Sequence, residues 1–127
     1  MEIEEVLFRL GILSNSAGYK LLLYALQLLL ACKGWNPSLK ELQREVNKIH
    51  TCTYDMFKQN INHAIKKIWM NRQRRDYLNQ ISPIALNGRP TVKQFIQILY
   101  GHIAQDTPNF PAPEAGFPPI IKKEDLS

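Results

Sequence analysis

Apolar residues recur at intervals of three and four along most of residues 2–105, the interval that places side chains on one face of a helix. No stretch shows the strict apolar–polar alternation of a half-buried strand. The pattern predicts a weaker helix over residues 72–81 and five stronger ones, over residues 2–10, 16–33, 38–49, 57–70 and 91–105. We therefore predict an all-α fold, a compact bundle of about six helices.

Signals for helix starts and stops support these boundaries. Ser16 stands at the start of the second segment and Gly34 lies just past its end. Capping-box spacing occurs in two pairs, Ser38/Glu41 and Thr91/Gln94. The apolar run 21–32 in the second segment is too short to cross a bilayer, since a span needs about 20 apolar residues. We expect a central helix buried on most sides, and no membrane partner.

The composition changes beyond Asp106. Five of the eight prolines lie between residues 107 and 127, where they remove backbone donors and prevent a regular helix. We therefore expect one domain over residues 1–105, followed by a flexible Pro-rich tail over residues 106–127. A short docking motif around the sequence FPPII is the alternative interpretation of the tail.

The net charge of +5 is unevenly distributed. Residues 56–105 carry eight Lys and Arg against Asp76 alone, which gives +7, whereas residues 1–55 sum to zero and residues 106–127 to −2. A positive field confined to one segment is typical of a protein that binds a polyanion such as nucleic acid. A basic segment also occurs on soluble domains with no such partner.

The segment 57–70 has two chemically different faces when it is placed on a helix. The apolar face holds Phe57, Ile61, Ala64, Ile65 and Ile68, and the opposite face holds Asp55, Gln59, Asn62 and Lys66, with His63 beside them. An amide carries a donor and an acceptor side by side and can pair bidentately with adenine, while lysine can reach guanine acceptors or phosphate. The pattern favours a helix laid in the major groove of DNA. An ordinary solvated helix is the alternative.

A turn of about four residues joins this segment to the preceding one. Two helices with such a connection, the second polar outward and basic at its end, fit a helix-turn-helix. Thr51 and Thr53 in the turn are candidate caps for the second helix, whose first N–H groups can then meet a DNA phosphate.

Three stretches, in order, resemble the C-terminal effector domain of stage zero sporulation protein A, the sporulation response regulator of endospore-forming bacteria. LFRLGILSNSAGYKLLLYALQLLL is similar to that domain's first two helices, and INHAIKKIW to the Ile-Arg-His-Ala-Ile-Glu-x-x-Trp of its recognition helix. GRPTVKQFIQIL is similar to the Lys-Pro-Thr-Asn-x-Glu-Phe-Ile that opens its last helix. The resemblance covers about residues 3–105. It implies a helical domain whose fourth helix enters the major groove, bound in tandem on a short A/T-rich, GC-containing box.

The chain departs from the family on the reading surface. The family has arginine at the positions of Met56, Gln59 and Asn62 and glutamate at that of Lys58, whereas His63 matches. Arginine pairing with guanine is the commonest specific contact, so we expect the family's box to be recognised weakly or not at all. We expect an A-richer site, read by Gln59 and Asn62, in its place. Drift to a paralogue that reads DNA poorly is the alternative.

Two sets of candidate DNA contacts follow from the helix pattern and the resemblance. The base-reading set is Met56, Lys58, Gln59, Asn62 and His63. The phosphate-binding set is Thr51, Thr53, Lys66, Lys67, Arg72, Arg74 and Arg75. Members of the second set hold the DNA backbone without reading its sequence.

The predicted function is a sequence-specific DNA-binding transcription regulator, bound to double-stranded DNA as a tandem homodimer or a symmetric pair in the bacterial cytoplasm, at the nucleoid. The family's effector domain normally follows a receiver domain, whereas this chain begins on the effector's first helix. We therefore expect no phosphorylatable aspartate, and control by abundance, by partner binding or by the tail. The rival interpretation is a protein-interaction module that modulates a full-length regulator or RNA polymerase.

The sequence carries no motif that indicates catalysis, a cofactor or metal binding. The chain has no paired carboxylates in one apolar stretch, no glycine-rich phosphate loop and no nucleophile elbow, so we expect neither an enzyme nor a cofactor. The candidate metal ligands His50, Cys52, His63 and His102 lack close metal-ligand spacing, so we expect no metal site. Two cysteines without close partners fit a reducing cytoplasm, and the acidic N-terminus is not a signal peptide.

Overall fold

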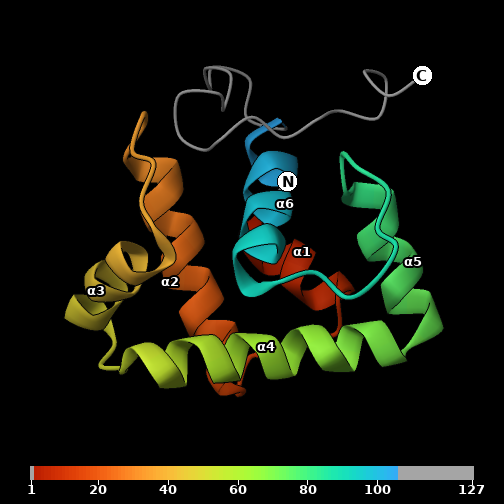
Figure 1. Ribbon diagram of the computed structural model, residues 1–127, viewed down its shortest axis with the longest axis horizontal. Helices are drawn as coiled ribbons and strands as arrows, with labels where there is room; N and C mark the ends of the chain where they lie inside the picture. Colours follow the sequence, from red (N-terminus) through yellow and green to blue (C-terminus); the bar gives the residue numbers. More distant parts are fainter. Residues whose placement is uncertain (1, 106–127) are drawn as a thin grey trace.

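The structure, a computed structural model, describes residues 2–105. These residues form six helices and no strand, so the predicted all-α fold is confirmed (Figure 1). The helices are α1 (Ile3–Arg9), α2 (Ala17–Ala31), α3 (Leu39–Ile49), α4 (Tyr54–Met70), α5 (Arg72–Ile81) and α6 (Val92–Gln105). The predictions for residues 106–127, both the flexible tail and the docking motif, lie outside the described residues.

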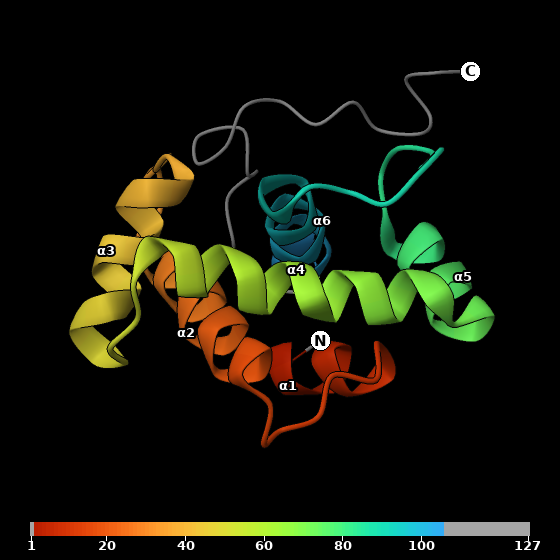
Figure 2. The same cartoon turned by 60° about the horizontal axis from the view of Figure 1, so that its bottom comes forward.

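The longest helix, α4, extends along one side of the molecule, and α2, α3, α5 and α6 pack against it. In Figure 1 it runs along the lower edge, with α3 at its start and α5 at its end. Figure 2 shows that none of the other five helices crosses in front of α4 when this side is turned forward. The fold therefore leaves one long face of α4 uncovered.

Helix α2 is the central support for α4, and it packs against α1, α3, α4 and α6. Its buried residues are Gly18, Leu21, Leu22, Ala25, Leu26 and Leu29, as expected for a helix surrounded on most sides. The two backbones come close at Gly18, where an added Cβ would lie 3.0 Å from the carbonyl oxygen of Asn60. A glycine at this position lets α2 hold the middle of α4 tightly from behind.

The inner face of α4 is anchored by apolar side chains. Phe57, Ile61 and Ile65 are fully buried and Ile68 is 1% exposed, as the periodicity predicted. They join a single core with Leu22, Leu26, Phe95 and other buried residues. Burying each of these side chains stabilises the fold by about 1.5–3 kcal/mol. Rotating α4 to hide its outer face would expose all four, so its orientation is strongly specified.

Local capping explains where the helices begin. Both predicted capping boxes are formed: Ser38 and Glu41 exchange hydrogen bonds of 3.1 Å and 3.1 Å, and Thr91 and Gln94 exchange bonds of 3.2 Å and 3.0 Å. Ser16 Oγ accepts from the N–H of Tyr19 at 3.3 Å, which confirms the predicted start of α2. Each bond satisfies an N–H group that has no partner inside the helix.

Candidate nucleic-acid interface

Helices α3 and α4 form the predicted helix-turn-helix, joined by the four residues His50–Thr53. Thr53 is the N-cap of α4, and its Oγ1 accepts from the N–H of Met56 at 3.1 Å. The cap lets α4 begin at Tyr54, three residues before the apolar face that indicated the helix. Thr51 was also expected as a cap, and that prediction is wrong, because Thr51 precedes the N-cap position by two residues.

The turn between the two helices is tied to α3 by two amide side chains. Gln43 Nε2 donates to the carbonyl oxygen of Cys52 at 2.7 Å, and the N–H of Cys52 donates to Asn47 Oδ1 at 2.9 Å. Neither residue is predicted as functional from the sequence. The signal was present, because Gln43 occupies an apolar-stripe position between Leu42 and Val46, where a buried amide needs a partner.

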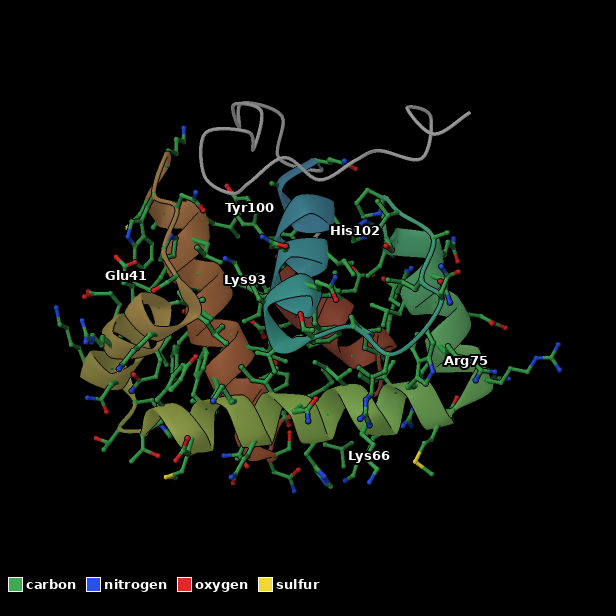
Figure 3. All side chains as sticks on the ribbon, in the orientation of Figure 1. Glu41, Lys66, Arg75, Lys93, Tyr100 and His102 are labelled. Atoms are coloured by element: carbon green, nitrogen blue, oxygen red, sulfur yellow. The ribbon has the colours of Figure 1, made fainter. Side chains whose placement is uncertain are left out.

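The uncovered face of α4 carries the amides. Its exposed residues are Asp55, Met56, Gln59, Asn62, His63, Lys66, Lys67 and Met70. Figure 3 shows Lys66 on the side of α4 that faces away from the other helices. Gln59 and Asn62 therefore protrude from the fold as the sequence pattern predicted. Whether they read bases remains a prediction.

Lys58 occupies a different position from the other candidate base-reading residues. It is half-buried, and its ammonium nitrogen lies 4.4 Å from the centroid of the Tyr54 ring, one helical turn earlier. A cation over an aromatic face is stabilised by about 0.5–1 kcal/mol at an exposed site. Lys58 thus lies on the flank of α4, and a base contact would require it to leave the ring.

The candidate phosphate contacts divide into free and packed cations. Lys66, Lys67 and Arg72 are exposed. Arg75 is half-buried: its Nη1 donates to the carbonyl oxygen of Trp69 at 3.4 Å, and its guanidinium carbon lies 5.8 Å from the Trp69 ring centroid. Arg74 is half-buried against the turn at Gly11. The exposed lysines are therefore better placed to meet phosphate than either packed arginine.

Three of the predicted contacts meet in one groove. Helix α4 and the segment 10–18 enclose a space of about 200 Å³, whose lining includes His63, Lys67 and Arg74. His63 and Lys67 belong to α4 and Arg74 to α5, and the turn after α1 lines another side of the groove. The grouping of two formal positive charges with a histidine gives this end of α4 the electrostatic character that suits a phosphate backbone.

Asp55 lies on the polar face of α4 but belongs to neither set of predicted DNA contacts. It is exposed in the first turn of α4, on the face of Gln59 and Asn62. A carboxylate there can accept from the N4 amino group of cytosine, and it repels phosphate. Asp55 therefore places an acceptor on the face of Gln59 and Asn62 and reduces the positive field at the start of α4.

The thiol of Cys52 lies inside the core, 4% exposed, and burial raises its pKa because the thiolate is the less favoured form there. Cys32, by contrast, is exposed at the end of α2. Within residues 2–105, no three His, Cys, Asp or Glu side chains group as a metal site would require. Over the same residues, no helix combines the length and the apolar character needed to span a membrane.

Comparison with known proteins gives one informative result. No curated protein and no solved structure matches the chain. A family model described as "Sporulation initiation factor Spo0A C terminal" matches residues 3–103, which is most of the chain and all six helices except the last two residues of α6. The helical fold, the helix-turn-helix and this match agree, and the chain belongs to the family of sporulation initiation factor Spo0A C-terminal domains.

Proposed function

We propose that this chain is a sequence-specific transcription regulator that inserts α4 into the major groove of DNA. The family is one of DNA-binding effector domains involved in transcription regulation and sporulation. The observation that carries the proposal is the uncovered face of α4, which presents Gln59 and Asn62 while its opposite face is buried in the core. Amides in this position are suited to adenine.

The proposal divides the interface into two roles. Met56, Gln59, Asn62 and His63 would meet base edges, with Lys58 joining them only after leaving the Tyr54 ring. Lys66, Lys67 and Arg72 would meet phosphates, supported by Arg74, Arg75 and the capped start of α4 at Thr53. Thr51 is exposed two residues before Thr53, so it would contact the DNA backbone directly.

We further propose a site richer in A than the family's box, bound by two copies in tandem at the bacterial nucleoid. The support is the replacement of the family's arginines by Met56, Gln59 and Asn62, since arginine favours guanine and amides favour adenine. The lysines of α4 replace the positive charge of the family's arginines, but they do not replace bidentate pairing with guanine, because an ammonium group acts as a point charge.

The direct test is selection of fragments from genomic DNA by the purified protein, followed by sequencing and by affinity measurements at several salt concentrations. We expect an enriched A-rich motif, and log K falling with log[salt] by about 0.9 for each phosphate neutralised. Recovery of fragments without any shared motif would refute sequence-specific reading. An affinity independent of salt would refute the phosphate contacts.

A second candidate function is a protein-interaction module that acts on a full-length regulator or RNA polymerase. It is favoured by Phe8 and Leu13, which are 79% and 68% exposed and line a groove of about 590 Å³ near the start of α5. Exposed apolar side chains grouped in this way mark interaction surfaces. Replacing both with serine should leave DNA binding unchanged, and it should abolish capture of either partner if this function holds.

A further inference from the structure

One residue of the turn, Cys52, is fixed in three ways. Its side chain is buried in the core, its carbonyl oxygen accepts from Gln43 and its N–H group donates to Asn47. Gln43 and Asn47 lie four residues apart on α3, so they present their amides from the same face of that helix. Gln43 is only 7% exposed, which protects its hydrogen bond from water.

The attachment lies immediately before the reading helix. Cys52 is followed by Thr53, the N-cap, and then by the first residue of α4. The caps at both ends of the turn have extended backbone, with φ −141° at His50 and φ −77° at Thr53, and the turn contains no glycine. The two amides therefore add a hydrogen-bonded connection between α3 and the start of α4 to the core packing that the two helices share.

We infer that Gln43 and Asn47 are positioning residues that determine sequence preference without touching DNA. This inference depends on the proposed function, because it concerns how α4 is presented to base edges. The base-reading candidates Met56, Gln59 and Asn62 lie in the first three turns of α4, next to the fixed point.

The consequence for recognition differs between bases and phosphates. Hydrogen bonds from an amide to a base edge operate over about 2.7–3.2 Å, so a shift of about 1 Å at the start of α4 breaks them. Lysine contacts to phosphate tolerate the same shift, because the four-carbon stem is flexible. Loosening the turn should therefore lower sequence preference far more than total affinity for DNA.

A charge-matched pair of substitutions tests this inference. Asn47→Asp keeps an oxygen acceptor for the Cys52 N–H, whereas Gln43→Glu replaces the donor with an oxygen that faces the Cys52 carbonyl. Both add one negative charge to the same face of α3, one turn apart, when the affinities are measured at a pH at which both carboxyls are ionised. Asn47→Ala removes the acceptor, and Gln43→Met removes the donor without burying a charge. Gln27→Ala removes an exposed amide on α2 and serves as the control.

The measured quantity is the ratio of affinity for the selected site to affinity for unrelated DNA at one salt concentration. We expect Gln43→Glu, Gln43→Met and Asn47→Ala to lower the ratio about tenfold or more, the equivalent of removing one bidentate pairing with a base. Asn47→Asp and Gln27→Ala should stay within about twofold of the unaltered protein, less than the about 1.4 kcal/mol of a tenfold change. Equal losses for Asn47→Asp and Gln43→Glu would overturn the inference, since charge alone would then explain both.

A structural readout without DNA separates this inference from the proposed function. Residual dipolar couplings of the backbone N–H groups report the angle between α3 and α4. We expect the angle to change in Gln43→Met and Asn47→Ala and to be retained in Asn47→Asp. An unchanged angle in the first two variants overturns the positioning role even if DNA binding is intact. A protein without a preferred site refutes the proposed function, and the angle still decides whether the two amides position α4.

Discussion

Replacing Gly11 with alanine is expected to destabilise the fold through two separable effects. Gly11 follows α1 with φ +75°, a conformation that costs an L-residue about 1–2 kcal/mol. A Cβ at Gly11 would also overlap the Nε and Cζ atoms of Arg74, which packs over this turn. The overlap involves the far end of a flexible side chain, so Arg74 can move away at the expense of its own packing.

Other glycines of the chain separate the two effects. Gly34 has φ +82° and no atom within 4 Å of an added Cβ, so Gly34→Ala measures the backbone strain alone. Gly101→Ala in α6 also meets nothing within 4 Å and should stabilise the protein by about 0.5–1 kcal/mol, because glycine weakens a helix interior. We expect Gly11→Ala to destabilise more than Gly34→Ala, and the difference to be the contribution of Arg74 packing on the turn.

Thermal unfolding followed by circular dichroism measures the series. A change of 1 kcal/mol corresponds to about 4–8 °C in Tm for a domain of this size. The strain alone predicts a fall of roughly 4–16 °C for Gly34→Ala, and Gly11→Ala should fall further. Adding Arg74→Ala to Gly11→Ala should change Tm little further, because the added Cβ has already displaced Arg74 from the turn. A Tm for Gly11→Ala equal to or above that of Gly34→Ala would refute the packing of Arg74 on the turn.

Three shorter predictions concern caps and titratable groups. Thr53→Ala should lower the free energy of unfolding by about 1 kcal/mol, because it removes the α4 cap, while Thr51→Ala should change it by less than about 0.5 kcal/mol in the same denaturant titration. The backbone N–H and the hydroxyl of Ser38, the capping partner, lower the pKa of Glu41, so the stability that the ionised carboxylate contributes is present above the ordinary pKa of a glutamate and is lost as pH falls through the lowered value. Glu41→Gln should therefore flatten the acid side of a plot of unfolding free energy against pH. An unchanged plot would contradict the capping bond. Exposed Cys32 should be alkylated in the native protein while buried Cys52 resists, as mass spectrometry would show. Because burial raises the pKa of Cys52, the contribution of its thiol to the free energy of unfolding should be complete below the ordinary thiol pKa and decline as pH rises beyond it.

The parts of the structure that were predictable are those set by neighbours in the sequence. The outward face of α4 follows from helical periodicity, since Phe57 and Ile61 must be buried and Gln59 lies opposite them. The capping boxes are likewise three-residue patterns. The approach of Lys58 to Tyr54 is also local, at a spacing of four residues, and this interaction could have been predicted.

What could not be predicted depends on residues brought together by the fold. Arg74 is predicted to contact phosphate, which stays a prediction, but its packing on Gly11, 63 positions earlier in the chain, was not foreseen. No periodic pattern connects the two residues. The hydrogen bond from Gln43 to Cys52 spans nine residues and the one from Cys52 to Asn47 spans five, across a turn whose path the sequence pattern does not determine.

The proposed function requires the amide face of α4 to read bases while its lysines hold the DNA backbone, and one comparison of paired variants separates these two roles. Affinities of Gln59→Ala/Asn62→Ala and of Lys66→Ala/Lys67→Ala should be measured on the selected site and on unrelated DNA across a range of salt. We predict that the amide pair loses preference for the selected site with an unchanged salt slope, whereas the lysine pair weakens both DNAs alike and reduces the slope by about 0.9 for each phosphate that is no longer neutralised. The same loss of affinity on both DNAs for the two pairs would contradict the account.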